Sequence, residues 1–470
     1  MMIDVLRSAA PRSNRLLLLM LPLVLLLSSC GGSSNSSPPP PISPPPATPS
    51  PAEIRTAQLN DALHPLQTTD PAAGLTDLAP LSRVAQARVV GMGEGTHGTR
   101  QFFRMKHRIF RWLVEEHGVR VFAMESDVAE GIYLDRYVQT GEGDLEAIML
   151  ARMHYWPWYT EEMRDLIQWM ADYNAGRPEQ ERLRYVGVDS ATVGLQPDLL
   201  IQYLTRTAPD LLDAAEDAVG PLRVSMAGAW ELYAAMSQGD YDRLREGLEA
   251  LTDILLNRRA ELVVAGSEAD FELHMYLLRN LLDSHAAMFM VYNAAWIDQS
   301  HHRERSLANN VLRLEALTEP GIRVALWGHN LHVAASPHGE GFPTMGSLLR
   351  ETLGDEYQAV GFSWAHGEFM AQAPGVGVMK HVHPLPPLAG SVNELLHSAD
   401  EENFILDLTS LPVAELRNWL VQPRNFLQVG SVYWPEYPPS DYYDLNAMLE
   451  RFDVLIHIDR SEAASPLPIP

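Results

Sequence analysis

Short apolar runs alternate along most of this chain with longer segments in which apolar residues recur at helical spacing. Runs bounded in this way are typical of the buried strands of an α/β layered domain. We therefore predict an α/β fold with a mostly parallel central sheet flanked by helices. The predicted strands are residues 87–92, 119–124, 183–188, 322–327, 357–362 and 452–458, with 404–408 as a weaker seventh.

Between residues 196 and 316 the pattern changes to long helical segments without a convincing strand, for example at 241–258 and 269–290. This change predicts a helical insertion, or cap, between the third and fourth strands, where it would overhang the ends of the strands. Residues 371–387 are rich in Gly, Pro and His and predict an exposed loop.

Polar side chains follow the predicted strands at the points where the strands end. Because ligands of open α/β sheets bind outside the carboxyl ends of parallel strands, we expect these side chains to converge on one edge of the sheet. The side chains are those of Glu94, His97, Glu125, Asp189, His329 and His332.

The first strand ends in Gly91-Met-Gly-Glu-Gly-Thr-His-Gly98, which places a carboxylate three residues before an imidazole. A histidine can take a proton from water, and a neighbouring carboxylate can orient the ring and stabilise the imidazolium. The alternative is a structural turn in which Glu94 caps the next helix and His97 fills a polar gap.

Lys106 falls on the apolar face of the helix predicted at residues 99–116. A buried lysine needs a carboxylate partner, such as Glu94 or Glu125, or a substrate anion. The alternative is that its ammonium group reaches the surface along an extended side chain. Trp158 lies in an aromatic segment that suits either a pocket wall or a core cluster.

The N-terminal region has the layout of an export signal: arginines precede an unbroken apolar stretch at residues 16–27, and small residues lead to Cys30. This setting resembles the lipobox of bacterial lipoproteins. We predict a signal peptide at 1–29, a lipid anchor at Cys30 and a Gly/Ser/Pro-rich linker at 30–52. The expected location is the bacterial cell envelope, on the outer membrane. A signal peptide that ends near Cys30 by chance is the alternative.

The chain is acidic, with a formal net charge of −25 that becomes −27 when three arginines and one aspartate leave with residues 1–29. Such acidity argues against nucleic acid as a partner. The remaining 53–470 segment is large enough to bury the core of a catalytic domain.

The motifs together resemble the erythromycin esterase family over roughly residues 83–468. Two departures are that the family's basic residue after the first motif is often Arg, and that its later Arg-Asp pair is here Arg303-Glu304. The segments that carry the resemblance are 93–97, Lys106, Glu125, 169–174, 303–310, 328–332 and 452–457.

The resemblance implies a hydrolase of a small-molecule carboxylic ester, such as a macrolide lactone, in which His97 activates water; with the anchor predicted at Cys30, we expect a lipid-anchored enzyme without a cofactor. Glu94 and Glu125 would orient the base and the water, and His329 with His332 would complete the polar centre. We expect three further residues to contact the substrate, namely Lys106, Trp158 and Arg303.

Two alternatives remain open. A metal-dependent hydrolase or protease of the same superfamily would bind Zn²⁺ or Mn²⁺ through Glu94, His97, His329 and His332. A non-enzymatic surface lipoprotein would use these histidines to bind haem or another ligand.

Overall fold

The computed structural model describes residues 49–318, 321–339 and 341–468. The predicted signal peptide, Cys30 and most of the linker therefore lie outside the described residues. Within the described part of the chain, no helix is long and apolar enough to cross a membrane.

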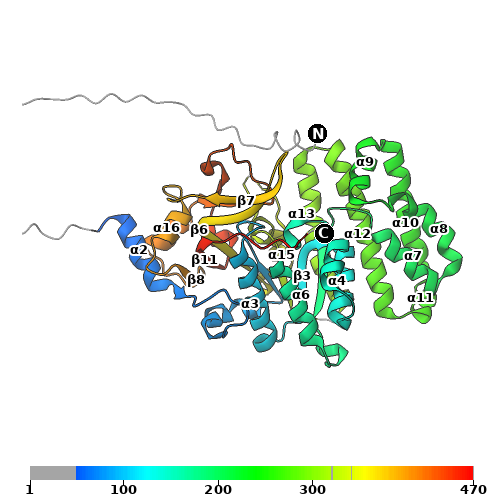
Figure 1. The fold of residues 1–470 in the computed structure, drawn as a ribbon, viewed down its shortest axis with the longest axis horizontal. Coiled ribbons are helices and arrows are strands. Elements are labelled where there is room, and N and C mark those ends of the chain that lie inside the picture. Colours follow the sequence, from blue (N-terminus) through cyan, green and yellow to red (C-terminus); the bar gives the residue numbers. More distant parts are fainter. Residues whose placement is uncertain (1–48, 319–320, 340, 469–470) are drawn as a thin grey trace, which may run out of the picture.

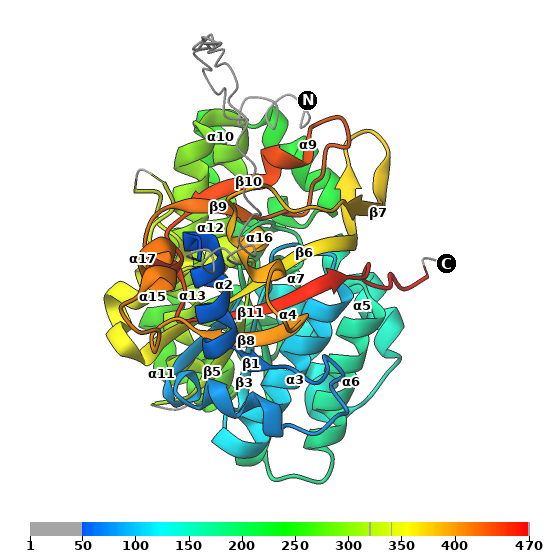
Figure 2. The same ribbon diagram turned by 90° about the vertical axis from the view of Figure 1, so that its left-hand side faces the viewer.

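A mixed nine-stranded sheet forms the centre of the molecule (Figures 1 and 2), in the order β1, β8, β11, β6, β2, β5, β3, β4, with β7 paired to β6. The strands from β11 to β4 run parallel, and β8, β1 and β7 are antiparallel to their neighbours. All seven predicted strands are present. The strands are β1 (His64–Pro65), β2 (Val89–Met92), β3 (Val121–Asp127), β4 (Arg184–Asp189), β5 (Val324–Trp327), β6 (Tyr357–Ala373), β7 (Gly377–His383), β8 (Asn403–Asp407) and β11 (Val454–Ser461).

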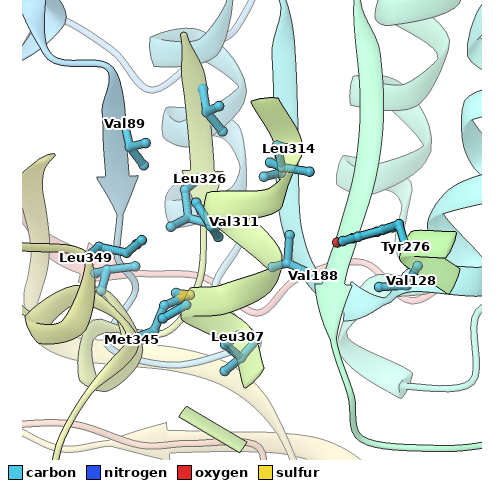
Figure 3. Packing of buried hydrophobic residues seen from close by; sticks show 14 of the residues in the cluster. Val89, Val128, Val188, Tyr276, Leu307, Val311, Leu314, Leu326, Met345 and Leu349 are labelled. Carbon is cyan, nitrogen blue, oxygen red and sulfur yellow. The ribbon is translucent and has the colours of Figure 1, made fainter. Parts of the chain in front are cut away.

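Helices cover both faces of this sheet, which is why its strands are apolar along their whole length. In β5, Val324 and Leu326 join one core cluster, whereas Ala325 and Trp327 join the cluster on the opposite face. Figure 3 shows the first cluster, in which Leu307 and neighbouring residues of one long helix pack between the sheet and further helices.

The helices, in chain order, are α2 (Pro51–Ala62), α3 (Arg100–His117), α4 (Val128–Thr140), α5 (Leu145–Arg152), α6 (Glu161–Asn174), α7 (Gln196–Thr207), α8 (Leu212–Val219), α9 (Met226–Ala235), α10 (Gln238–Asn257), α11 (Arg259–Ala265), α12 (Glu268–Asn293), α13 (Trp296–Leu317), α14 (Asn330–Val333), α15 (Met345–Leu353), α16 (Val392–His397), α17 (Glu415–Leu420) and α18 (Met448–Arg451).

Helices α7 to α13 form the predicted insertion between β4 and β5, and α7 to α12 gather on one side of the molecule (Figure 1). The insertion is attached to β4, the last strand of the sheet, by side chains that bond to its backbone carbonyls. Tyr276 donates to Gly187 at 3.0 Å, Asn280 to Asp189 at 2.9 Å and Asn310 to Val188 at 3.0 Å. These bonds satisfy carbonyl groups that would otherwise lie unpaired at a covered sheet edge.

The prediction of an exposed loop at residues 371–387 is wrong for most of this range. Strand β6 continues to Ala373, and the chain then turns back into β7. The polar pattern of β7 is inverted relative to an ordinary half-buried strand. His381 and His383 point into the protein, whereas Val378 and Val382 are exposed. The sequence therefore reads as a loop although the backbone forms a regular hairpin.

Candidate active site

The carboxyl ends of four neighbouring parallel strands, in the order β2, β5, β3, β4, bring the predicted polar residues to one edge of the sheet. Because β5 lies between β2 and β3, the residues that follow it stand between Glu94 and Glu125. A cavity of about 320 Å³ opens at this edge. Its lining includes His97, Glu125, Arg303, His329 and His332.

Glu94, His97 and Lys106 form a hydrogen-bonded chain beside the cavity. The Nδ1 atom of His97 lies 2.7 Å from Oε1 of Glu94, and the ammonium of Lys106 donates to Oε2 of Glu94 at 2.6 Å. Glu94 and Lys106 are fully buried, and the ammonium also lies 3.9 Å from the ring centroid of Trp327. The predicted burial of Lys106 against a carboxylate is confirmed. No described residue hydrogen-bonds Nε2 of His97, so this nitrogen is available at the cavity.

Burial lowers the pKa of Lys106 to about 8, although Glu94 and Glu125 act in the opposite direction. At neutral pH the ammonium is therefore still charged and balances the buried Glu94 carboxylate.

The turn at residues 91–98 contains four glycines, and none of them has φ in the left-handed region. Glycine is needed here because neighbouring atoms leave no room for a side chain. A Cβ on Gly98 would come within 2.0 Å of the carbonyl oxygen of Met370 in β6, and one on Gly93 within 2.2 Å of Oδ1 of Asn330. Asn330 itself bonds both backbone groups of Phe362, at 2.7 and 3.0 Å. The turn therefore packs closely against both β6 and α14, and this packing fixes the position of His97.

Glu125 is held by three donors. Its Oε2 accepts from the backbone amide of His329 at 2.8 Å, and its Oε1 accepts from Arg303 at 3.1 Å and lies 3.2 Å from Nε2 of His332. Burial would raise the pKa of Glu125, but His332, His97 and Arg303 outweigh it and hold the pKa well below its usual range. Glu125 is therefore a fixed negative charge and not an acid or base that exchanges protons near neutral pH.

His332 lies between two carboxylates, with Nε2 facing Glu125 and Nδ1 bonded to Glu304 of α13. Burial acts to lower the pKa of His332, but the two carboxylates raise it to about 10. The ring is consequently a doubly protonated imidazolium at neutral pH, with both nitrogens donating.

His329 has the opposite character. Its Nδ1 accepts the backbone amide of Leu331 at 3.2 Å as the N-cap of α14. Burial, together with His97 and His332, holds the pKa of His329 well below its usual value. A neutral ring that accepts at Nδ1 carries its proton on Nε2, and this Nε2 atom is buried without a partner among the described residues. The ring centroid of His329 lies 5.0 Å from the ring centroid of His97.

Two of the three residues expected to contact substrate lie behind His97 and do not line the cavity. Trp158 is fully buried and meets the ring of His97 edge-on at 5.5 Å, and Lys106 is reached only through Glu94. Arg303 does line the cavity, but its Nε and Nη2 atoms donate to the two carboxylate oxygens of Asp189, at 3.0 and 2.5 Å. In the structure, each of these three residues contacts other residues of the site. That they also contact the substrate stays a prediction.

Of the four residues considered as metal ligands, Glu94 and His332 have their donor atoms occupied, whereas Nε2 of His97 and Nε2 of His329 have no partner among the described residues. Glu94 bonds His97 and Lys106, both nitrogens of His332 face carboxylates, and Nδ1 of His329 holds a backbone amide. Among the residues that the structure describes, no group of three or more His, Cys, Asp or Glu side chains is arranged to hold a metal ion. The proposed ligand set therefore offers two free donor atoms, fewer than the three or more protein ligands of a typical Zn²⁺ site.

Several residues and contacts of the site were not predicted. Asp189 was expected at this edge of the sheet, but its ion pair with Arg303 was not, and Glu304 was seen only as part of a motif. The C-terminal part of the cavity wall carries no recognisable motif and comes from a two-stranded sheet of β9 (Arg424–Leu427) and β10 (Tyr443–Asn446), at the same end of the molecule as β7 (Figure 2). The additional lining residues are Tyr155, Leu331, His338, Gln428, Gly430, Ser431 and Asp444.

Comparison with known proteins gives consistent relatives. The model of the family "Erythromycin esterase" matches residues 114–461, a range that begins after the turn bearing His97. Erythromycin esterase type II of Escherichia coli is 22% identical over 424 residues, which are 85% of this chain and 96% of the relative.

Two solved structures share the fold. A succinoglycan biosynthesis protein superposes with a TM-score of 0.78 at 22% identity and covers 90% of this chain and 100% of its own. A mutant of the erythromycin esterase EreC in its open conformation gives a TM-score of 0.66 at 15% identity, with 85% and 98% covered.

Proposed function

The chain belongs to the erythromycin esterase family, and we propose that it hydrolyses a carboxylic ester with a water molecule that His97 activates. The observation that carries this proposal is the buried chain Lys106–Glu94–His97, which ends in an imidazole nitrogen at the cavity. A carboxylate that holds Nδ1 orients the ring and stabilises the imidazolium that forms when Nε2 takes a proton.

The reaction requires one proton to move twice. Nε2 of His97 takes a proton from water as the water oxygen forms a bond to the ester carbonyl carbon, and the carbonyl oxygen becomes an oxyanion. The bond between that carbon and the alkoxide oxygen then breaks as His97 returns the proton to the leaving oxygen. The products are an acid and an alcohol, and the base is regenerated.

The oxyanion needs hydrogen-bond donors that are in place before the reaction starts. His329 offers such a donor, because it lines the cavity and its Nε2–H is buried without a partner among the described residues. The fixed imidazolium of His332 and the guanidinium of Arg303 add positive charge at the same edge of the sheet. In this assignment His97 exchanges protons, His329 donates a hydrogen bond, and His332 only carries charge.

The names of the relatives make a macrolide lactone the first substrate to test. The test is to incubate the purified protein, without added metal, with a panel of macrolides and simple aryl esters, and to examine the products by mass spectrometry. A product heavier than the substrate by one water, or the corresponding acid and alcohol, would support the proposal.

His97→Ala in parallel should give no product, whereas His64→Ala, at an exposed residue of β1, should behave as wild type. Equal product from His97→Ala and wild type would contradict the assignment of His97. A change in the haem Soret band without turnover of any ester would instead favour ligand binding.

We also propose that the protein is anchored in the cell envelope by lipid at Cys30, as the sequence predicts. Labelling of cells with an alkyne fatty acid should mark the wild-type protein and not Cys30→Ser. Unchanged labelling and membrane fractionation of Cys30→Ser would contradict the anchor.

A further inference from the structure

A hairpin at the outer edge of the molecule takes no part in the mechanism above. It consists of the end of β6, from Gly367 onward, and of β7, which pairs with β6 alone among the described strands (Figure 2). Large apolar side chains are exposed along ten residues of this segment, namely Val376, Val378, Met379, Val382 and Leu385. The described part of the chain exposes fourteen such side chains, so more than a third of them gather here. A cluster of this kind marks a surface that meets a partner, whereas scattered apolar residues need no explanation.

The hairpin is firmly attached to the protein, so the exposure of its outer side chains follows from the fold. On its inner side, His381 is buried, and its ring centroid lies 4.8 Å from that of Tyr433. The amide of Gln372 in β6 donates to the carbonyl of Ser431 at 2.9 Å, and Ser431 lines the cavity. The hairpin and this wall of the cavity are therefore joined directly.

The same segment is free of the negative charge that the rest of the chain carries. Asp and Glu make up 60 of the 470 residues, yet none lies between residues 369 and 393. Lys380 is the only Lys or Arg there, and its ammonium lies 3.0 Å from the carboxylate of Glu368 at the base of the hairpin. The outer face of the hairpin is thus nearly neutral on a chain with a net charge of −25, and it can approach an anionic surface that repels the other faces.

We propose that this hairpin docks on a lipid bilayer, with Val376, Val378 and Val382 entering the boundary between head groups and acyl chains. Apolar side chains gain free energy at this boundary, and the backbone of the edge strand does not have to enter the hydrocarbon. The lipid anchor proposed at Cys30 would keep the bilayer within reach, because residues 30–48 can span at most about 65 Å. The docking surface goes beyond ester hydrolysis and does not depend on it.

Fluorescence from a single labelled cysteine tests the inference at the hairpin itself. In the full chain, Cys30→Ser removes the one native thiol together with any lipid on it, and Val382→Cys supplies a site for the environment-sensitive label NBD. On vesicles of phosphatidylethanolamine and phosphatidylglycerol, we expect the NBD emission to rise at least about twofold and to move to shorter wavelength. Lipids with a doxyl group on the acyl chain should quench this emission.

The matched control is Val413→Cys in the same Cys30→Ser chain. Val413 is 85% exposed and lies just before α17, on the other side of the molecule from β7 (Figure 2), so its label should not respond to vesicles. Adding Val378→Asp to the chain labelled at position 382 should abolish the response there, because a carboxylate on the same face of β7 opposes contact with the bilayer.

A response at position 382 and not at position 413 supports the inference whether or not any ester is hydrolysed. No response at either position, an equal response at both, or a response that Val378→Asp retains overturns it. An emission at position 382 that rises with protein concentration without vesicles would show that a second copy of the chain covers this face, and overturns the inference as well.

Discussion

Replacing His332 by Gln tests the electrostatic description of the site, because it removes the buried imidazolium between Glu125 and Glu304. The folded state raises the pKa of His332 from 6.5 to about 10. At about 1.4 kcal/mol per pH unit, this rise corresponds to about 4 to 5 kcal/mol of the free energy of unfolding. His332 is almost completely buried, so solvent screening reduces this figure little.

The sign of the pH dependence follows from the direction of the shift. The folded state keeps the proton that the unfolded state loses above about pH 6.5, so this stabilisation is complete below that pH and is lost as the pH rises toward about 10. Lys106, whose folded pKa is depressed to about 8, contributes a slope of opposite sign only above that value. Between about pH 6.5 and about pH 8, the pH dependence of the free energy of unfolding therefore reports the contribution of His332 and not that of Lys106.

Urea unfolding followed by tryptophan fluorescence measures the effect. The destabilisation caused by His332→Gln should shrink by about 2 kcal/mol between about pH 6.5 and about pH 8. His64→Gln, at an exposed position, should show no such trend. A loss of stability in His332→Gln that is the same at both pH values would refute the assignment of a permanent imidazolium.

Three further substitutions have defined outcomes. Lys106→Met should cost about 3 to 5 kcal/mol in urea unfolding at neutral pH, because it leaves the buried Glu94 carboxylate without its cation; a cost below about 1 kcal/mol would show that this ion pair is not what holds the turn. His329→Ser keeps an N-cap hydroxyl for α14 but removes the Nε2–H donor, so kcat should fall by about 10² to 10³ in steady-state assays; an unchanged kcat would remove His329 from the oxyanion site. Asn310→Leu should lower the free energy of unfolding by about 1 to 3 kcal/mol, since the carbonyl of Val188 at the edge of β4 loses its donor; equal stability of variant and wild type would mean that this carbonyl finds another partner.

The strands and the position of the site could be predicted because a parallel sheet covered on both faces produces continuous apolar runs. Glu94, His97, Glu125, His329 and His332 follow such runs, so their convergence required only a parallel topology. The hairpin of β6 and β7 could not be predicted, because His381 and His383 point inward and reverse the usual pattern.

The protonation states of the two later histidines also could not be predicted from their spacing. His332 is charged because Glu125 and Glu304, the latter from helix α13 of the insertion, face its two nitrogens, and His329 is neutral because burial, His97 and His332 lower its pKa. Gln428 directly follows β9 and Asp444 lies in β10, two short strands joined by a long connection, and only the tertiary fold brings them to the cavity.

The central claim is that His97 is the base that activates water. Its most direct test is kcat/KM of His97→Ala on the best ester of the panel, with circular dichroism to confirm that the variant is folded. The account predicts a loss of about 10² to 10⁴ without a change in fold. A folded His97→Ala protein that hydrolyses the ester at close to the wild-type rate would contradict it.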